Sequence, residues 1–371
     1  MRCCIECFKD IDIRARIHGV NELGQCDISK LHKNKTWTMD LNRLDHTSEY
    51  GNGMVPDFEE IADLYTPVAS DYPSGRQLSE QLRERWGIFS LTHDEINTFL
   101  SAVLQDYFKK NPEVQYGLVV PALQPGSGFF EDASILSGKS WSDFEEVIQH
   151  QNRFHNGLFQ PDKLTYFFQQ MINEIPSGKR YFRARIIQED EMPLTPKEIG
   201  SAPPGRAAAG RLNATGISYL YLGSDQTTIV LEIKAAIQDT VAIGEYEVIA
   251  PLHVVDLEKL ANLGPFRISD KSSYLINRPI LLAIDNALRR QSGRQRSEVE
   301  YAPTEYISDL IKTMTDGNND PVDGIFYDST VNPGYKDLVL FNSEKVVLKD
   351  DIKYYKIHDL IPKLKPYSNA E

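Results

Sequence analysis

The feature that most constrains the fold is a change of residue pattern at the turn signal Pro176-Ser-Gly178. Before it, apolar residues recur at the three- and four-residue spacing of amphipathic helices. After it, short β-branched and aromatic runs are separated by Gly, Pro and polar residues, which is typical of strands joined by loops. The second part lacks the regular β–α alternation of a doubly wound sheet. We therefore expect an α+β protein, with a helical part followed by a mixed part.

The expected elements give a division into segments. Helices are expected at 56–65, 78–86, 96–108, 141–150 and 162–175, and later at 279–290 and 303–314. Strands are expected at 179–187, 217–222, 241–249, 254–257, 324–327 and 338–341. The resulting segments are a cysteine-containing segment at 1–50, a helical domain at 51–176, a mixed domain at 179–345, and a terminal strand and short helix within 346–371.

Charge and hydropathy exclude some functional classes. The chain of 371 residues has 40 basic and 53 acidic residues, a net charge of −13. General nucleic-acid binding and binding to anionic membranes require a basic face, so we expect neither. No apolar run reaches the roughly 18 residues of a membrane span, and the first residues lack the apolar core of a signal peptide. We expect a cytoplasmic protein, in which a local basic pocket remains compatible with the overall charge.

The cysteines point to a metal site. All four lie within the first 26 residues: Cys3, Cys4, Cys7 and Cys26. Clustered cysteines in a cytosolic chain favour metal binding over disulfides. Cys4-x2-Cys7 followed by Cys26 resembles a zinc ribbon, whose fourth ligand would stand near position 29. That residue is Ser29, so Cys3 or His32 would have to replace it. The alternative is a degenerate ribbon that folds without zinc.

Two arginines in the strand at 179–187 are candidate ligand-binding residues. Alternation places Tyr181, Arg183 and Arg185 on one face, and Phe182, Ala184 and Ile186 on the other. We expect the second face to be core and the first to be polar. Guanidinium groups on the polar face could bind phosphate oxygens in bidentate fashion. The alternative is a solvated strand face.

A loop rich in Gly, Pro and Ala at 201–216 contains the next candidates. Arg211 and Asn213 lead from this loop into the strand that carries Tyr221. Small residues let the backbone approach a ligand closely, and Tyr221 could stack on a flat ring or donate a hydrogen bond. The bland alternatives are a surface loop and a packed tyrosine. The loop has the glycine spacing of a P-loop but lacks its lysine, so we exclude a nucleotide triphosphatase.

Glu232 and Ser329 complete the candidate set. Apolar neighbours make Glu232 partly buried, and a buried carboxylate requires an arginine or a ligand hydroxyl as partner. The alternative is a structural ion pair. Ser329 follows the strand at 324–327, a common position for a ligand contact or for a serine that caps a turn.

In this order, these residues resemble the RES domain over roughly residues 179–345. Its pieces here are Arg183, the Gly-Arg-x-Asn loop with Arg211, Tyr221, the Thr-x-x-x-Glu element ending at Glu232, Pro303-Thr304, and the strand Gly324-Ile-Phe-Tyr-Asp-Ser329. The helical part resembles the HEPN-like domain often fused ahead of RES. Ser29 departs from the cysteine usual in that domain, and the Arg-x4–6-His spacing of HEPN ribonucleases is absent.

The resemblance implies an ADP-ribosyltransferase-like fold and an enzyme that destroys NAD. Such enzymes cleave the nicotinamide–ribose bond by phosphorolysis, with inorganic phosphate as co-substrate, or by hydrolysis. Many act as toxins with an antitoxin partner, so an antitoxin, a regulatory protein or a second copy of the chain are the partners implied. The helical domain would regulate the enzyme, for example by occluding the NAD cleft until a trigger such as phage infection displaces it. The alternatives are ADP-ribosyl transfer to a macromolecule and a non-catalytic partner-binding module.

The resemblance also assigns roles to residues. Glu232 would grip a ribose hydroxyl and stabilise the developing cation, and Ser329 would bind the nicotinamide ribose or the acceptor. The catalytic set it implies is Arg183, Tyr221, Glu232 and Ser329. The set that would bind NAD is Arg183, Arg211, Asn213 and Tyr221.

Overall fold

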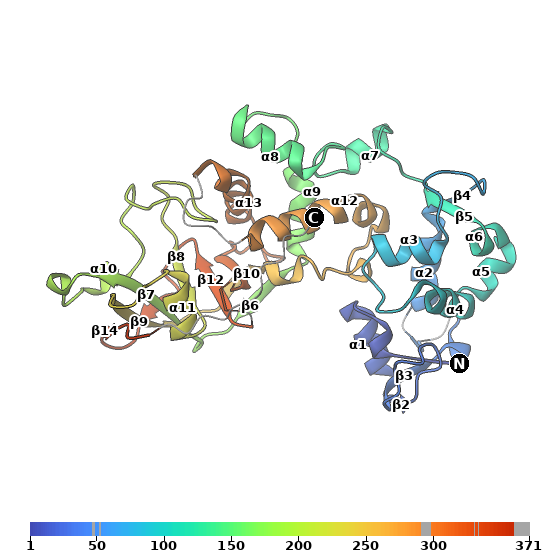
Figure 1. Ribbon diagram of the computed structural model, residues 1–371, viewed down its shortest axis with the longest axis horizontal. Helices are drawn as coiled ribbons and strands as arrows, with labels where there is room; N and C mark the ends of the chain where they lie inside the picture. Colours follow the sequence, from blue (N-terminus) through green and yellow to red (C-terminus); the bar gives the residue numbers. More distant parts are fainter. Residues whose placement is uncertain (47–48, 52, 291–297, 330, 333, 360–371) are drawn as a thin grey trace. The chain divides into compact units, whose positions relative to one another are not determined.

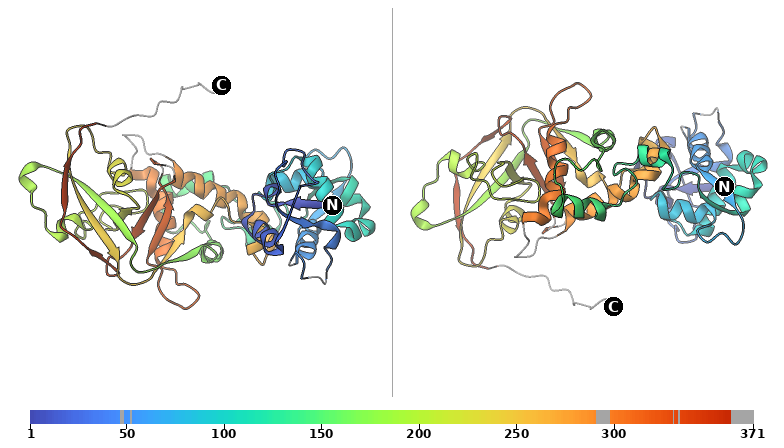
Figure 2. Two further views of the ribbon diagram at one scale, coloured as in Figure 1. Left: turned by 90° about the horizontal axis from the view of Figure 1, so that it is seen from below. Right: turned by 90° about the horizontal axis from the view of Figure 1, so that it is seen from above.

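The computed structural model describes residues 1–46, 49–51, 53–290, 298–329, 331–332 and 334–359 (Figures 1 and 2). Contacts within the chain divide it into two compact units. The first unit contains Met1–Val147, Phe154–Gln170 and Lys259–Asp285. The second contains Ile148–Arg153, Met171–Glu258 and the chain from Asn286 onward.

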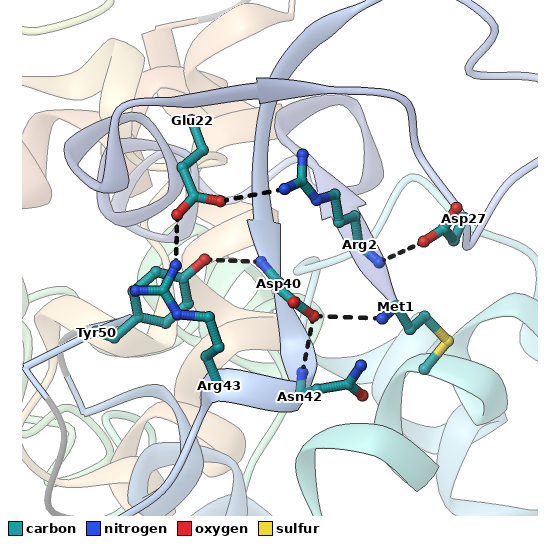
Figure 3. Close-up of polar contacts among 8 residues, drawn as sticks. All are labelled: Met1, Arg2, Glu22, Asp27, Asp40, Asn42, Arg43 and Tyr50. Carbon is teal, nitrogen blue, oxygen red and sulfur yellow. Dashed lines mark hydrogen bonds and ion pairs between the residues drawn. The ribbon is translucent and has the colours of Figure 1, made fainter.

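The first unit begins with a small antiparallel sheet. Its elements are β1 (Arg2–Cys4), η1 (Ile5–Cys7), α1 (Ile11–Val20), β2 (Glu22–Gly24), β3 (Thr36–Asp40) and η2 (Leu41–Arg43), with strand order β1-β3-β2. Polar contacts tie its strands together, as Figure 3 shows. Glu22 on β2 lies 3.7 Å from the guanidinium of Arg2 on β1 and 2.6 Å from that of Arg43. Helices and strands therefore form much of residues 1–43, where the sequence is only weakly patterned.

Helices form most of the first unit. They are α2 (Met54–Asp63), α3 (Leu78–Arg85), α4 (His93–Val103), α5 (Gln105–Lys110), α6 (Pro112–Tyr116), α7 (Gly128–Ala133) and α9 (Pro161–Gln169), with η5 (Pro265–Arg267). A hairpin joins β4 (Tyr65–Val68) to β5 (Leu118–Pro121). Two further helices, α8 (Trp141–His150) and α12 (Lys271–Arg289), begin in this unit and end in the second.

The core of the first unit contains a cluster of phenylalanines. Phe8, Phe58, Phe89 and Phe99 form it, with ring centroids 5.3 to 5.9 Å apart. The pairs are edge-on or tilted, except for the stacked pair Phe58–Phe89, and such aromatic pairs add to the free energy gained by burying the rings. Thr92 and Glu95 form a capping box at the start of α4, so the helix and its register follow from the sequence.

The second unit is built on one nine-stranded mixed sheet. Its strands are β6 (Ile172–Ile175), β7 (Arg180–Ile187), β8 (Leu220–Gly223), β9 (Thr240–Val248), β10 (Leu252–Asp256), β11 (Gly324–Asp328), β12 (Lys336–Leu340), β13 (Val346–Leu348) and β14 (Lys353–Lys356). The order is β13-β9-β7-β8-β12-β11-β10-β6, and β14 also pairs with β9. Only β10 and β11 pair in parallel in this path.

Apolar side chains cover both faces of this sheet. On one face a cluster joins β7, β8, β9 and β12 through residues such as Tyr181, Leu222 and Leu338. On the other face, Ile229 of α11 (Gln226–Glu232) packs against Ala184 of β7 and Ile243 of β9. The remaining helices of the unit are η3 (Glu189–Glu191), α10 (Pro196–Ile199), η6 (Glu298–Tyr301) and α13 (Ala302–Lys312), with η4 (Leu257–Lys259) at its edge. The expected α+β class is confirmed.

The two covered faces correct the expectation for the strand at 179–187. Tyr181, placed on the polar face by alternation, is 7% exposed and lies in a core cluster, whereas Ile186, placed in the core, is 37% exposed. Alternation separates polar from core residues only when one face of a sheet is solvated, and here both faces of β7 are packed.

Several element boundaries also differ from expectation, among them the start of α12, expected at 279 and observed at Lys271. The helix expected at 162–175 ends at Gln169, and β6 occupies Ile172–Ile175. The strand expected after 345 is β13, but a further strand, β14, follows it within the described residues. The end of the expected terminal helix, at 360–364, lies outside the described residues. None of the helices in the described ranges has the length and apolar character that crossing a membrane requires.

The close pairing of β11 with β12 gives a test of the fold. A Cβ on Gly324 would overlap the backbone carbonyl oxygen of Val339, and backbone cannot move aside. We expect Gly324→Ala to lower the free energy of unfolding by about 1–3 kcal/mol and to weaken hydrogen-exchange protection in β11 and β12. Gly317→Ala is the control, because a Cβ there meets no atom within 4 Å. Equal urea midpoints for the two variants would contradict this packing.

Candidate functional site

A cavity of about 470 Å³ in the second unit is lined by three of the candidate residues, Arg211, Tyr221 and Glu232. Residues of β8, α11, β11, β12 and the loops beside them line it: Arg211, Tyr221, Leu222, Ile229, Glu232, Ile233, Lys234, Tyr301, Tyr327, Val331 and Asp337. A cavity of this size lies in the range of small-molecule sites. Carboxyl groups and cationic side chains both reach it, so it suits a ligand with anionic and neutral polar parts.

The strand register builds one side of the cavity. Tyr327 of β11 pairs with Asp337 of β12, and Asp337 pairs with Gly223 of β8, so the three residues form one row across the sheet. Directly opposed residues share a face. Gly223 has no side chain, and a Cβ there would lie 3.2 Å from that of Ile229. The glycine therefore lets α11 lie close to the sheet beside Asp337 and Tyr327.

Helix α11 and the turn after β11 hold Glu232. Thr228 and Glu232 are four residues apart and so lie on one helix face. Asn332 Nδ2 donates to Thr228 Oγ1 at 2.9 Å, and Ser329 Oγ donates to Glu232 Oε1 at 2.7 Å. The Thr-x-x-x-Glu spacing thus lets α11 contact the turn after β11 at two points, through Thr228 and Glu232. Glu232 is half-buried, and its partner is a serine, which the sequence alone did not indicate.

Asp337 lines the cavity and was not among the candidate residues predicted from the sequence. Its side chain lies on β12 in a residue only 4% exposed, and within the described ranges neither carboxyl oxygen has a hydrogen-bond partner of good geometry. Burial, followed by the negative charge of Glu232, raises the pKa of Asp337 to about 8, although the charge of Arg211 opposes the rise. The available signal was an aspartate inside the apolar strand Lys336–Leu340, where a charge is costly without a function.

The Gly-Arg-x-Asn loop is folded around Tyr221. Asn213 is buried and its Oδ1 accepts a hydrogen bond from the Tyr221 hydroxyl at 2.7 Å. Its Nδ2 donates to three carbonyl oxygens of the loop, those of Ala208, Ala214 and Ile217. A Cβ on Gly210 would come within 2.6 Å of Asn213 Oδ1. Asn213 therefore supports the loop and the ring of Tyr221 instead of lining the cavity.

The start of α13 holds Arg211 in place. Thr304 Oγ1 donates to the backbone carbonyl oxygen of Arg211 at 2.7 Å and to that of Tyr301 at 3.0 Å. Arg211 and Tyr301 both line the cavity. In the Pro303-Thr304 motif of the sequence, Thr304 therefore holds the loop that contains Arg211 against the start of α13.

Arg183 has a different position from the one that its predicted role implies. Among the described residues, it is not one that lines the cavity. Its Nη1 donates to the backbone carbonyl oxygen of Tyr221 at 3.0 Å, and burial lowers its pKa. Arg185 is exposed and forms an ion pair with Glu191 at 2.9 Å. Arg211, Tyr221 and Glu232 thus line one cavity, and Ser329 is hydrogen-bonded to Glu232. Asn213 and Arg183 contact Tyr221, at its hydroxyl and at its carbonyl oxygen respectively.

Two features of the first unit bear on the assignment of sites. Cys4, Cys7 and Cys26, the predicted metal ligands, come together with His32. A cavity of about 610 Å³ is lined by residues such as Leu41, Glu59 and Asp106, and its described lining contains no arginine or lysine. An anionic ligand is therefore better served by the cavity of the second unit.

Residues 182–359 match the model of the RES domain family, and this part of the chain is a RES domain. The matched range contains every residue that lines the cavity of the second unit. A RES domain is compatible with an enzyme that acts on NAD. Comparison with curated proteins gave no match, and neither did comparison with solved structures. The likeness of the helical part to a HEPN-like domain stays a prediction.

The raised pKa of Asp337 predicts a pH dependence of stability. The folded carboxyl binds its proton up to a pH of about 8, whereas an unfolded one releases it near about 3.9. Asp337 therefore makes the folded state less stable as the pH rises from about 4 to about 8. We expect Asp337→Asn, which has no proton to lose, to show a smaller decline in urea midpoint between pH 5 and pH 8.

The comparison with the parent protein isolates this one group. Burial also raises the pKa of Glu305, to about 7, so both proteins should lose some stability with rising pH. Only the difference between them reports Asp337. Parallel declines would show that the Asp337 carboxyl is charged in the folded protein at neutral pH.

Proposed function

We propose that the RES domain of this protein cleaves the nicotinamide–ribose bond of NAD. The single observation that carries the proposal is the half-buried Glu232, whose carboxylate is held by Ser329 at 2.7 Å in a cavity that Arg211 also lines. The family match is compatible with an NAD-acting enzyme, and the site supplies the groups that this reaction needs.

The chemistry requires a negative charge beside the ribose. When the C–N bond breaks, its electron pair goes to the nicotinamide nitrogen and the ribose becomes oxocarbenium-like. A fixed carboxylate stabilises such a cation. Ser329 Oγ donates to Oε1 of Glu232, and in the proposed complex Oε2 accepts a hydrogen bond from a ribose hydroxyl.

Asp337 adjusts the charge of the site. Burial and the charge of Glu232 favour its protonated form near neutral pH. A protonated Asp337 leaves the negative charge on Glu232 and avoids the repulsion of two adjacent carboxylates. It also provides a hydrogen-bond donor for a ribose oxygen at the same place.

Arg211 is the proposed anchor for the pyrophosphate. Its guanidinium can form two parallel hydrogen bonds to phosphate oxygens, and Thr304 fixes its backbone. The same group could bind an inorganic phosphate that attacks the ribose. Tyr221 lines the cavity, and its hydroxyl is already bonded to Asn213. Arg183 then acts as a positioning residue, through the carbonyl oxygen of Tyr221.

The biological setting follows from the reaction. Loss of NAD harms any cell, so an enzyme of this kind requires control. We propose a toxin or defence effector held inactive by the N-terminal part of the chain or by an antitoxin. Deletion of residues 1–50, which belong to the first unit, tests the first arrangement: release from inhibition would lower the growth and the NAD content of cells that express the shortened chain.

The deciding experiment is incubation of the purified protein with NAD, with and without inorganic phosphate, followed by chromatography. Nicotinamide with ADP-ribose-1-phosphate identifies phosphorolysis, and nicotinamide with free ADP-ribose identifies hydrolysis. Transfer of label from NAD to an added cell extract identifies ADP-ribosylation of a macromolecule. Intact NAD under all conditions, both for the full chain and for the chain without residues 1–50, with cells that tolerate both, would refute the proposal and favour a binding module.

Glu232→Gln tests the role of the carboxylate. The amide keeps the size of the side chain and loses its charge, so we expect NAD cleavage to fall by about 10²–10³-fold with little change in the melting temperature. Arg185→Ala is the matched control, since this arginine is exposed and paired with Glu191, and its activity should equal that of the parent. Full activity in the Glu232 variant would remove the carboxylate from the mechanism.

Arg211→Ala tests the phosphate anchor. Hydrogen bonds to charged groups contribute about 1.5–3 kcal/mol, so we expect KM for NAD to rise by roughly 10- to 100-fold, with a smaller effect on kcat. Arg211→Lys should recover part of the loss, because lysine keeps the charge but not the planar fork. An unchanged KM in both variants would place the pyrophosphate elsewhere.

A further inference from the structure

Four side chains with zinc-binding atoms converge in the first unit, and the RES domain does not contain them. They are Cys4, Cys7, Cys26 and His32, and their Sγ and Nδ1 atoms all lie within 4.8 Å of one another. The Sγ of Cys7 is 3.8 Å from that of Cys4 and 3.5 Å from that of Cys26. Nδ1 of His32 is 3.3 Å from Cys4 Sγ and 3.5 Å from Cys7 Sγ.

These separations are those of ligands around one tetrahedral ion. With a Zn–S distance of about 2.3 Å and a Zn–N distance of about 2.05 Å, a tetrahedron separates two sulfurs by about 3.8 Å and a sulfur from a nitrogen by about 3.6 Å. The four distances in the structure differ from these by at most a few tenths of an ångström. A disulfide would need about 2.05 Å, and all four cysteines of the chain are free thiols.

The fold explains how Cys26 reaches the cysteines near the start of the chain. Cys4 ends β1 and Cys7 ends the short helix η1 that follows. Asp27, next to Cys26, is bonded to Arg2 in both directions. Its backbone N–H donates to the Arg2 carbonyl oxygen at 2.8 Å, and its Oδ2 accepts from the Arg2 N–H at 2.7 Å (Figure 3). These two bonds between Asp27 and Arg2 therefore place Cys26 beside β1 without help from a metal.

A turn explains why His32, and not Ser29, provides the fourth group. The Ser29 hydroxyl accepts from the Leu31 N–H at 3.3 Å, and the Ser29 carbonyl oxygen accepts from the His32 N–H at 3.2 Å. Ser29 thus shapes the loop and His32 enters the cluster three residues later. Cys3 is buried on the opposite face of β1 from Cys4 and does not belong to the group.

We propose that Cys4, Cys7, Cys26 and His32 bind one zinc ion in a closed, structural Cys₃His site. Four protein ligands leave no position for water or substrate, which is the distinction between structural and catalytic zinc. The residue after Cys7 is Phe8, which packs in the phenylalanine cluster of the first unit. The ion therefore secures the N-terminal sheet to the loop at 26–32 at a point that adjoins this core.

The test is metal analysis of the purified full-length chain. We expect about one zinc per chain, lost in Cys26→Ser and His32→Ala, kept in the control Cys3→Ser, and kept in His32→Cys because four thiolates also bind zinc. Cobalt(II) exchanged into the site should give the visible absorption of a tetrahedral thiolate complex. Chelation should lower the melting temperature of the parent and of Cys3→Ser.

The proposal can be refuted even if the variants of the ligand residues fail to fold. The parent and Cys3→Ser alone decide it, since both keep all four proposed ligands. A parent protein that contains no zinc after purification with zinc present, takes up no cobalt and melts at the same temperature with chelator would overturn the proposal. Loss of metal in Cys3→Ser with retention in Cys26→Ser would assign a different ligand set.

Discussion

The hydrogen bond from Ser329 to Glu232 is the contact on which the candidate site depends. It joins the turn after β11 to the end of α11, two segments almost a hundred residues apart in the chain. The helix itself is only seven residues long and would not persist alone. Its position comes from apolar packing on β7 and β9, from the small size of Gly223 beneath Ile229, and from this bond. The carboxylate is thus placed by tertiary structure.

Much of the fold was predictable from the sequence, for physical reasons that differ between the units. Amphipathic helices such as α4 carry their own start signal in Thr92 and Glu95 and bury a periodic stripe. Strand positions followed from β-branched and aromatic runs. The polar and core faces of β7 could not be predicted, because the sheet is covered on both sides and Tyr181 is buried. Short strands such as β1 and β2 have too few residues to show a period.

The candidate site was predictable as a set of residues, but not as a set of contacts. The order of Arg211, Tyr221, Glu232 and Ser329 along the chain indicated a common ligand, and these four lie together. Asp337 was not predicted, because its place beside the cavity depends on strand register: it pairs with Tyr327 on one side and with Gly223 on the other. No pattern within a single strand reveals its neighbours on the next. Arg183 is the opposite case. It belongs to the expected motif, but within the described residues it does not line the cavity and contacts only the backbone carbonyl oxygen of the cavity residue Tyr221.

The strands after residue 345 have a consequence for how the RES domain must be cut from the chain. Strand β9 pairs with β7 on one side, and its other edge is covered first by β13 and then by β14. A chain ending at 345 would keep every residue of the cavity and yet expose nearly the full length of β9. Unpaired N–H and C=O groups along a long edge recruit strands from other molecules. Such a fragment would fail by self-association, with an intact active-site sequence, and any isolated domain has to retain the strand at 353–356.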